Sequence, residues 1–241
     1  MQKFRGYCFS LFFMLWTMIV CSLGMPFIIV RKGKTSLITA HFWARTTLWV
    51  MEKMVGLRYE VRGLENVPEG SCVIACKHQS AFDTCVFHKL FDKTAYVYKK
   101  ELTYVPFVRW HLRNSGSIAV DRSSGTTAMR TLLEGVKKRI SQGFKIVIFP
   151  EGTRVGVDEK KEYNPGVAFL YDKIKDLKVV PAALNSGLFW GRYSFEKRPG
   201  TIIIEFLPAI DAGMSKREFL QLIENNIEKT TKKLIEEDKK V

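Results

Sequence analysis

The sequence predicts an α/β protein, in which a single domain with a mixed, largely parallel sheet flanked by helices follows membrane-associated helices at the N-terminus. Three observations predict this class. An apolar segment opens the chain, short β-rich runs alternate with helical segments after Gly56, and polar motifs stand directly after several of those runs. We therefore divide the chain into a helical anchor, residues 1–56, and a globular domain, residues 57–241.

The composition favours anionic partners. The chain of 241 residues has 38 Lys and Arg against 24 Asp and Glu, a formal net charge of +14. This balance suits phosphorylated metabolites, anionic lipid headgroups or nucleic acid, and charge alone does not choose among them. The cysteines form neither a C-x-x-C pair nor a zinc-ligand spacing with histidine, which predicts free thiols in a reducing compartment. They are Cys8, Cys21, Cys72, Cys76 and Cys85.

Residues 7–30 are almost free of charge and are long enough to cross a bilayer, which takes about 20 apolar residues. Pro26 is expected to kink or end this helix. A secretory signal peptide is the alternative, but the run is long for one and no small-x-small cleavage site stands out. The flanks give no clear orientation, because both are basic: Lys3 and Arg5 precede the run, and Arg31, Lys32 and Lys34 follow it.

A second helix is predicted over residues 36–55, and its aromatic residues include Trp43 and Trp49. Such a helix suits the membrane interface or a position against the domain core, and one face could serve both. If the two N-terminal helices hold the same leaflet, they form a monotopic hairpin, which accounts for basic residues on both flanks. That arrangement predicts that the globular domain lies on the cytoplasmic side of the membrane.

The globular part alternates strands with helices. A strand is predicted over residues 71–76, in which residues 72–76 are apolar as in a buried strand, and residues 144–149 form the most apolar strand of the domain. An amphipathic pattern predicts a long helix over residues 126–141, which Gly143 ends. The remaining strands are predicted at residues 59–61, 94–98, 117–120, 179–184 and 201–207, and the remaining helices at 80–90, 107–112, 165–174 and 215–237. This alternation indicates a largely parallel or mixed sheet that is covered on both faces.

The motif H-Q-S-A-F-D, residues 78–83, follows the buried strand and places His78 at the edge where open α/β sheets build their sites. The five-residue spacing lets the Asp83 carboxylate fold back on the imidazole, accept its Nδ1 proton and leave Nε2 as a general base. Ser80 to Asp83 also fits the S-x-x-D capping box of ordinary helices. On this motif alone, capping and catalysis are equally supported.

Two further motifs follow strands. F-P-E-G-T-R, residues 149–154, combines Gly152 for close backbone approach with an Arg154 fork that matches phosphate, although a surface turn with a solvated arginine has the same pattern. G-S-I-A-V-D-R, residues 116–122, ends in Arg122, and Lys99 ends the strand before it. If these strands are parallel neighbours, His78 and the cations converge on one rim. That layout suits deprotonation of a hydroxyl on a phosphorylated molecule.

These motifs resemble, in order, the conserved blocks of the glycerolipid acyltransferases. H-Q-S-A-F-D resembles their H-x4-D motif, residues 116–122 their second block, F-P-E-G-T-R their third, and V-P-A at residues 180–182 their fourth. The resemblance covers roughly residues 70–185, and the N-terminal helices are similar to those of bacterial 1-acylglycerol-3-phosphate acyltransferases. The chain departs from the family pattern at Lys77, where asparagine is frequent, and at Ala182.

The resemblance implies an O-acyltransferase that forms phosphatidic acid. The acyl group would pass from acyl-CoA or acyl-carrier protein to the sn-2 hydroxyl of 1-acyl-sn-glycerol 3-phosphate, with His78 as base and Asp83 orienting it. Lys99, Arg122 and Arg154 would bind the acceptor's phosphate, while Glu151, Gly152 and Thr153 would position the acceptor or stabilise the oxyanion. The expected partners are the lysophospholipid, the acyl donor and membrane lipids, with no nucleic acid, no metal and no cofactor beyond the donor.

Other functions remain open at this stage. The acceptor could be another lysolipid, such as a lyso-ornithine lipid, or glycerol 3-phosphate. A Ser-His-Asp hydrolase would use Ser80, although there is no G-x-S-x-G elbow. A basic membrane-surface binding protein explains the charge and the N-terminus, but it gives no reason for polar residues at successive strand ends. We expect His88 and His111 to be structural or exposed rather than ligands, and we expect a solvated face for the C-terminal helix with Glu228 and Lys232.

Overall fold

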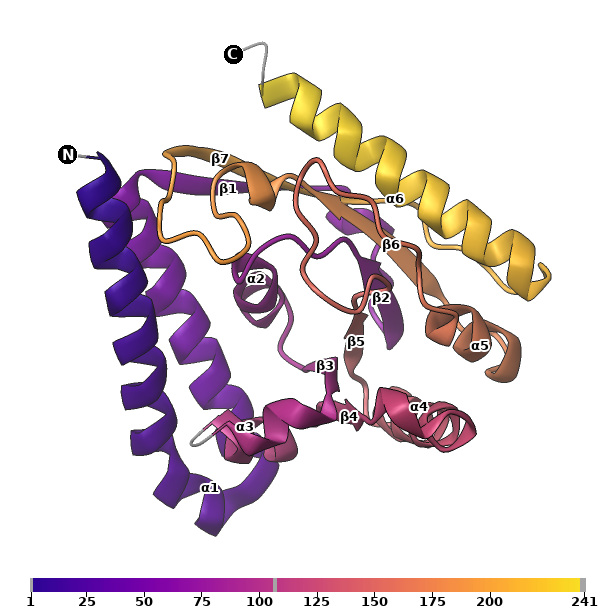
Figure 1. The fold of residues 1–241 in the computed structure, drawn as a ribbon. Helices are drawn as coiled ribbons and strands as arrows, with labels where there is room; N and C mark the ends of the chain where they lie inside the picture. Colours follow the sequence, from indigo (N-terminus) through magenta and orange to yellow (C-terminus); the bar gives the residue numbers. More distant parts are fainter. Residues whose placement is uncertain (1, 106–107, 239–241) are drawn as a thin grey trace.

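The computed structural model describes residues 2–105 and 108–238, and of residues 28–34 the backbone only. One seven-stranded sheet has the order β1-β7-β6-β2-β5-β3-β4 (Figure 1). The strands are β1 (Leu57–Arg62), β2 (Cys72–Cys76), β3 (Thr94–Lys99), β4 (Ile118–Val120), β5 (Lys145–Ile148), β6 (Val179–Leu184) and β7 (Gly200–Phe206). The helices are α1 (Gln2–Val55), α2 (Phe82–Leu90), α3 (Val108–Asn114), α4 (Thr126–Ile140), α5 (Gly166–Lys173) and α6 (Lys216–Asp238).

The sheet is mixed, which confirms the predicted fold class. β6, β2, β5, β3 and β4 run parallel to one another. β7 runs antiparallel to β6, with Ala183 opposite Glu205, and β1 runs parallel to β7. The carboxyl ends of the five parallel strands therefore lie at one edge of the sheet, where such sheets place their sites.

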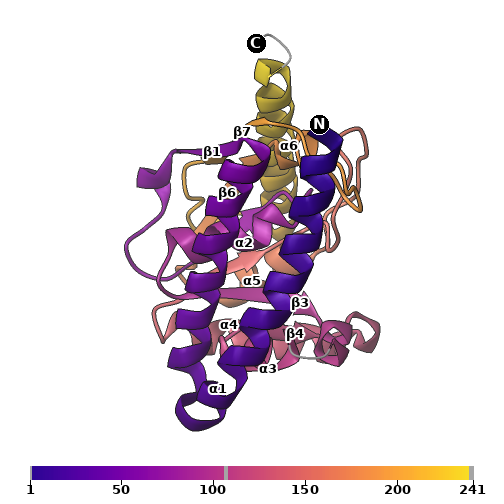
Figure 2. The same ribbon diagram turned by 90° about the vertical axis from the view of Figure 1, so that its left-hand side faces the viewer.

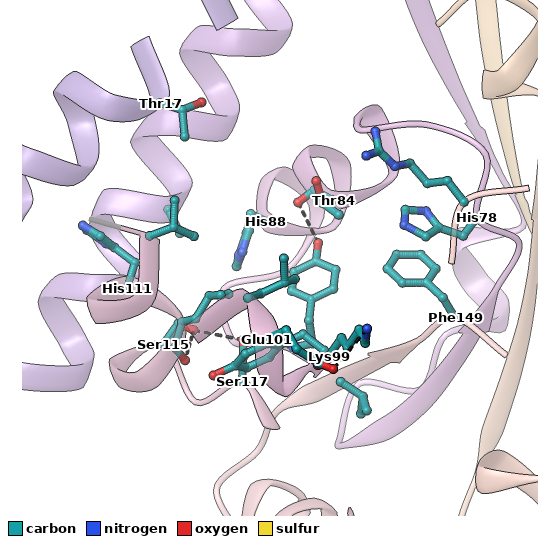
Figure 3. A pocket seen from close by; sticks show the side chains of 18 of the residues that line it. Thr17, His78, Thr84, His88, Lys99, Glu101, His111, Ser115, Ser117 and Phe149 are labelled. Atoms are coloured by element: carbon teal, nitrogen blue, oxygen red, sulfur yellow. Dashed lines mark hydrogen bonds and ion pairs between the residues drawn. The ribbon is translucent and has the colours of Figure 1, made fainter. Parts of the chain in front are cut away.

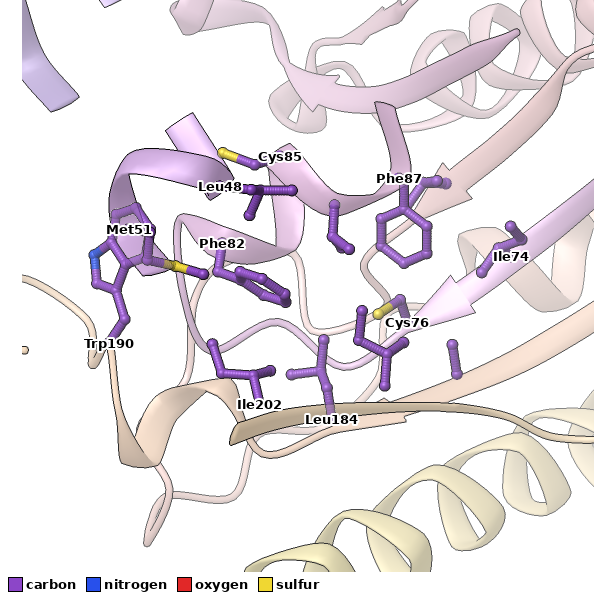
Figure 4. Packing of buried hydrophobic residues seen from close by; sticks show 14 of the residues in the cluster. Leu48, Met51, Ile74, Cys76, Phe82, Cys85, Phe87, Leu184, Trp190 and Ile202 are labelled. Atoms are coloured by element: carbon purple, nitrogen blue, oxygen red, sulfur yellow. The ribbon is translucent and has the colours of Figure 1, made fainter. Parts of the chain in front are cut away.

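β2 lies near the centre of the sheet, and its residues are all buried. Successive side chains of a strand point to opposite faces. Ile74 accordingly packs in a cluster with α1 and α2, whereas Val73 packs in a cluster with α4, α5 and α6. Helices thus cover both faces, and Figure 4 shows the first cluster, to which Phe82 and Phe87 of α2 and Ile74 of β2 all belong. Burial on both faces explains why this strand reads as a continuous apolar run.

α1 doubles back on itself, so that its two arms, residues 2–27 and 35–55, lie side by side (Figures 1 and 2). Side-chain hydrogen bonds join the arms: Trp16 Nε1 donates to Thr46 Oγ1 over 2.7 Å, and Trp43 Nε1 donates to Thr17 Oγ1 over 3.0 Å. The predicted helical hairpin is therefore present as one bent helix. The side chains of Arg31, Lys32 and Lys34, expected to flank the apolar run, lie outside the described residues.

The first arm exposes most of its apolar surface. It is long and apolar enough to cross a membrane, yet only 28% of its most apolar window is buried, whereas the core helix of a soluble protein is mostly buried. The second arm is two-sided, because Leu48 and Met51 are buried in the domain core while Trp49 is exposed. Exposed apolar side chains on the two arms include Leu11, Met14, Leu15, Met18, Ile19, Leu23, Phe27, Ile38, Phe42 and Trp49.

The predicted elements differ from the observed ones chiefly at their ends. The helix predicted from residue 80 begins as α2 at Phe82, because the Asp83 carboxylate takes the N–H groups of Gln79 and Ser80. The helix predicted over residues 107–112 corresponds to α3, and residue 107 lies outside the described residues. The C-terminal helix α6 buries one face, with Phe219, Ile223, Ile227 and Leu234 among its buried side chains.

Candidate active site

Four neighbouring parallel strands end at one edge and carry polar residues there. His78 follows β2, Lys99 ends β3, Arg122 follows β4 and Arg154 follows β5. All four line a single cavity of about 550 Å³. The sheet topology therefore brings together the base and the cations that sequence spacing predicted for one rim. Figure 3 shows His78 and Lys99 toward one end of this pocket and His111 and Thr17 toward the other.

The His78 imidazole is held by a buried carboxylate. Its Nδ1 lies 2.9 Å from Asp83 Oδ2, and Asp83 is fully buried, at 0% exposure, whereas the His78 side chain is 13% exposed. An ionised carboxylate only accepts hydrogen bonds, so Nδ1 carries the proton and donates to Asp83. Nε2 is then the unprotonated nitrogen of a ring that lines the pocket. A substrate hydroxyl in the pocket could give its proton to this atom.

Asp83 also organises the turn before α2. Its Oδ2 accepts the backbone N–H groups of Gln79 and Ser80, each at 2.8 Å, and its Oδ1 accepts the Ser186 hydroxyl at 2.7 Å. The bond from Ser80 is the backbone half of a capping box, so capping and orientation of His78 share one carboxylate. Ser80 itself is fully buried, and its Oγ accepts the Phe82 N–H, which leaves it badly placed as a hydrolase nucleophile.

An aromatic stack restrains the His78 ring. The rings of His78 and Phe149 are nearly parallel, at 15°, with their centroids 3.9 Å apart, and Tyr96 stacks beyond Phe149 at 6.1 Å. The hydrogen bond to Asp83 therefore fixes the position of Nδ1, and stacking on Phe149 fixes the plane of the ring. Neither Phe149 nor Ser186 was predicted as a site residue. A phenylalanine before Pro150 carries no polar signal, and Ser186 lies more than a hundred residues after Asp83.

Glu151 does not line the pocket, which corrects the expectation that it positions the acceptor or supports the oxyanion. It is fully buried, and its Oε2 accepts the backbone N–H of His78 over 2.9 Å. Its Oε1 lies 2.7 Å from Lys77 Nζ, which is buried as well. The pKa of Glu151 is raised, because burial outweighs the lowering by the Lys77 ammonium and the His78 N–H. Its carboxylate therefore holds the backbone of the histidine from behind.

The Gly152 N–H is not available to an oxyanion, because it donates to the Phe149 carbonyl over 2.9 Å. Among the described residues, the N–H groups of Thr153 and Arg154 have no hydrogen-bond partner, and both residues line the pocket. Of the two residues expected to offer a backbone donor here, Gly152 and Thr153, only Thr153 therefore has a free N–H among the described residues. Gly152 has another role, because its φ of +72° and its bare Cα let the Arg122 guanidinium donate to its carbonyl over 2.5 Å.

The cations at the rim are held differently from one another. Lys99 Nζ lies 3.1 Å from Glu101 Oε1 on the exposed surface, while Arg122 is tied to Gly152. The Arg154 guanidinium lies 5.4 Å from the ring centroid of Tyr193, and the Arg192 guanidinium lies 4.8 Å from the same centroid. Tyr193 also lines the pocket, and its φ is +56°. It was not predicted as a site residue from the sequence.

Beyond His78 the pocket is apolar and reaches α1. Both arms of the hairpin contribute to its wall, through Thr17, Val20, Cys21, Thr39, Ala40 and Trp43. His88 and His111 line this part and are buried, as expected for structural histidines. Burial lowers the pKa of His88 to about 3, so its ring is neutral, and His111 Nε2 lies 3.0 Å from the Cys21 carbonyl. The side chains of α1 and the His88 ring that line this part therefore carry no formal charge.

Comparison with known proteins places this site in context. The family model described as Acyltransferase matches residues 58–185, which include His78, Asp83, Lys99, Arg122 and Arg154. A protein of Pseudomonas aeruginosa named 1-acyl-sn-glycerol-3-phosphate acyltransferase is 39% identical over 181 residues, which span 75% of this chain and 70% of the relative. A protein of Saccharomyces cerevisiae with the same name is 31% identical over 172 residues, which span 69% and 56% of the two chains.

The fold has a counterpart among solved structures. The crystal structure of the 1-acyl-sn-glycerophosphate (LPA) acyltransferase PlsC from Thermotoga maritima superposes with a TM-score of 0.78. The match covers 97% of this chain and 98% of that protein at 18% sequence identity. At that identity the likeness concerns the fold, and it includes the N-terminal hairpin because nearly the whole chain is covered.

Proposed function

The chain belongs to the acyltransferase family and is an O-acyltransferase, and from this premise we propose that it acylates the sn-2 hydroxyl of 1-acyl-sn-glycerol 3-phosphate to form phosphatidic acid. The observation that carries the proposal is the position of the His78–Asp83 pair. It stands where an apolar pocket meets three cations, Lys99, Arg122 and Arg154. A lysophospholipid has the same order of parts: an acyl chain, a free hydroxyl and a phosphate. The names of the relatives support this acceptor.

The proposed reaction is a direct transfer. His78 Nε2 takes the proton of the sn-2 hydroxyl as the oxygen attacks the thioester carbonyl carbon, and Asp83 stabilises the imidazolium that forms. The tetrahedral oxyanion is placed at the Thr153 N–H, which has no other partner among the described residues. When the carbon–sulfur bond breaks, the thiolate leaves and takes the proton from the imidazolium. No acyl-enzyme forms in this scheme.

The acceptor's phosphate is assigned to the cations of the rim. Arg122 presents a guanidinium fixed by the Gly152 carbonyl, and a fixed fork recognises phosphate with little loss of side-chain entropy. Arg154 and Lys99 line the same pocket. A phosphorylated acceptor fits this charge better than a lyso-ornithine lipid does, and glycerol 3-phosphate would leave the apolar part of the pocket unused on the acceptor side.

Gly152→Ala tests the fixed position of Arg122. A Cβ at this position would lie against the Arg122 guanidinium and 2.9 Å from Asn164 Nδ2, and the positive φ would be strained. We expect transfer to fall by about 10²-fold, the cost of displacing a binding group by roughly 1 Å. Gly213→Ala is the matched control, because Gly213 also has a positive φ but nothing lies within 4 Å. If the two variants have the same kcat and KM, Arg122 does not take part in binding the acceptor.

The apolar part of the pocket is proposed to hold an acyl chain. Its wall includes Ala40 of α1, so Ala40→Phe would shorten the space with one aromatic ring. We expect the variant to lose at least about tenfold in relative rate with long acyl chains against shorter ones, since each methylene in a pocket contributes about 10-fold or more to discrimination. Ile38→Phe is the control, because Ile38 lies on the same arm with its side chain exposed. An unchanged chain-length profile for Ala40→Phe would place the chain elsewhere.

Membrane association is proposed from the exposed apolar surface of α1. Exposed apolar side chains lie on both arms, and a hairpin returns the chain to the same leaflet. Because the free cysteines indicate a reducing compartment, we place the domain on the cytoplasmic side of the inner membrane. Both acyl substrates would then reach the pocket along the membrane surface.

The proposed function is tested with detergent-solubilised full-length protein, labelled acyl donor and a panel of acceptors. Formation of phosphatidic acid from 1-acyl-sn-glycerol 3-phosphate is expected, with acyl-CoA or acyl-carrier protein supplying the acyl group. Glycerol 3-phosphate and a lyso-ornithine lipid serve as competing acceptors, and a preference for either would overturn the assigned acceptor. Acyl-CoA and acyl-carrier protein are assayed separately, because both bring the same thioester and phosphopantetheine to the rim.

A further inference from the structure

A cluster of buried charged side chains lies behind the catalytic histidine, outside the substrate pocket. Lys77 is 2% exposed, and its Nζ lies 2.7 Å from Glu151 Oε1 and 2.7 Å from Glu228 Oε1. Glu228 belongs to α6, is 28% exposed, and also accepts the Tyr163 hydroxyl over 2.9 Å. None of these four side chains lines the pocket. The cluster connects the C-terminal helix with the end of the central strand.

The cluster reaches His78 through the backbone. Lys77 is the last residue that the sheet holds in this segment, because its N–H donates to the Ala182 carbonyl of β6. The next N–H, that of His78, has left the strand pairing, and the Glu151 carboxylate accepts it instead. The His78 carbonyl accepts the Val155 N–H over 2.8 Å. The position of the histidine backbone therefore depends on a side chain whose own position is set by Lys77.

The charges explain why Lys77 is needed. Glu151 and Glu228 are drawn to one ammonium, and without it two carboxylates would face each other with little water. Burial lowers the pKa of Lys77, but the two carboxylates outweigh it and raise that pKa, so Lys77 is charged at neutral pH. Removing one member of a buried ion pair leaves an uncompensated charge, which drives protonation or displacement of what remains. A displaced Glu151 would no longer hold the His78 N–H.

We propose that Lys77 and Glu228 are positioning residues, which fix the Glu151 carboxylate and through it the catalytic histidine, so that the C-terminal helix α6 is coupled to the reaction centre. Neither residue touches substrate. Their loss should lower kcat and leave KM for donor and acceptor nearly unchanged, because the pocket walls stay as they are. A misplacement of the reacting nitrogen by roughly 1 Å costs about 10²-fold in rate.

The first test is a set of variants in detergent-solubilised full-length protein. Lys77→Met should lower kcat by about 10²-fold, with both KM values within about threefold of wild type. Glu228→Gln keeps the volume, removes one charge and should lower kcat by less. The double variant, Lys77→Met with Glu228→Gln, should recover at least part of the loss because one of the two unpaired carboxylates is gone. Glu224→Gln is the matched control, since Glu224 lies one turn earlier on α6 and pairs with the surface residue Lys160.

A second readout does not depend on the substrate, which matters because the kinetic prediction rests on the proposed function. The chain has 4 histidines, so ring-labelled histidine gives few NMR signals, and His78→Ala identifies the one of interest. We expect Glu228→Gln to shift or broaden the His78 ring signal and Glu224→Gln to leave it alone. If the variants of Lys77 and Glu228 leave the His78 signal and kcat unchanged, the proposed coupling is wrong. If wild type acylates no tested acceptor, the proposed function fails, and the NMR comparison still decides the coupling.

Discussion

His78→Ala is expected to lower acyl transfer by about 10²-fold to 10⁴-fold, the range that a general base contributes. Nε2 of this ring is the proton acceptor proposed for the substrate hydroxyl, and alanine leaves no group to replace it. The pocket walls and the cations stay in place, so KM for the lysophospholipid should change little. The loss should appear in kcat, measured with labelled acyl donor in detergent.

The matched control is His41→Ala. His41 lies on α1 outside the pocket, and its Nε2 lies 3.0 Å from the Asp92 carbonyl on the exposed side. This variant should retain wild-type kcat. Activity that survives in His78→Ala at a level similar to His41→Ala would reduce the H-Q-S-A-F-D motif to a helix cap and undo the proposed mechanism.

Asp83→Asn should lower kcat by about 10³-fold to 10⁴-fold, as expected when an orienting carboxylate is lost and the histidine takes the wrong tautomer. The Asp83 carboxylate accepts four hydrogen bonds, from His78, Gln79, Ser80 and Ser186. An amide can accept only on its oxygen, so an NH₂ group at the Oδ2 position would face three N–H donors in a fully buried place. Such an unsatisfied group costs about 1–3 kcal/mol of folding stability. The melting temperature should therefore fall by several degrees, together with kcat.

Two variants separate these effects. Ser186→Ala removes one hydrogen bond from Asp83 Oδ1 but keeps the charge, so the expected loss is about 1 kcal/mol of stability and a small change in rate. Asp172→Asn makes the same chemical change on the surface, where Asp172 pairs with Lys173 at 3.0 Å, and should alter neither quantity. An Asp83→Asn variant that melts lower yet transfers at the wild-type rate would limit Asp83 to the turn before α2.

Much of this fold could be predicted because local signals agreed with the global structure. The strand before His78 is buried on both faces of the sheet, so its residues are all apolar. A continuous apolar run of this length predicts a buried strand directly. The convergence of His78 with Lys99, Arg122 and Arg154 was also predictable, since parallel strands end at the same edge. The hairpin followed from two apolar segments with basic residues on both flanks.

Other parts of the site depend on contacts that sequence order does not reveal. The motif F-P-E-G-T-R places Glu151 beside Gly152 and Arg154, yet its side chain turns away from the pocket toward Lys77. The reason lies partly on α6, where Glu228 contacts the same Lys77 ammonium. In the sequence, the pattern of α6 predicts that Glu228 belongs to a solvated face. The Gly152 N–H donates to the Phe149 carbonyl within a turn. The motif itself does not indicate this hydrogen bond. Each difference arises from a residue far along the chain or from a backbone bond.

The pairing of β1 with β7 bears on how the protein is made. Leu57 of β1 lies opposite Gly200 of β7, so the first strand of the sheet cannot pair until the last strand has been synthesised. β2 likewise lies between β5 and β6, and its pairing is non-local on both sides. Because contacts of high sequence separation form slowly and leave apolar edges open meanwhile, the nascent chain is exposed to misassembly until its C-terminal third emerges. The apolar hairpin is complete long before that moment, so early insertion of α1 into the bilayer would keep the waiting strands of one chain apart from those of the next.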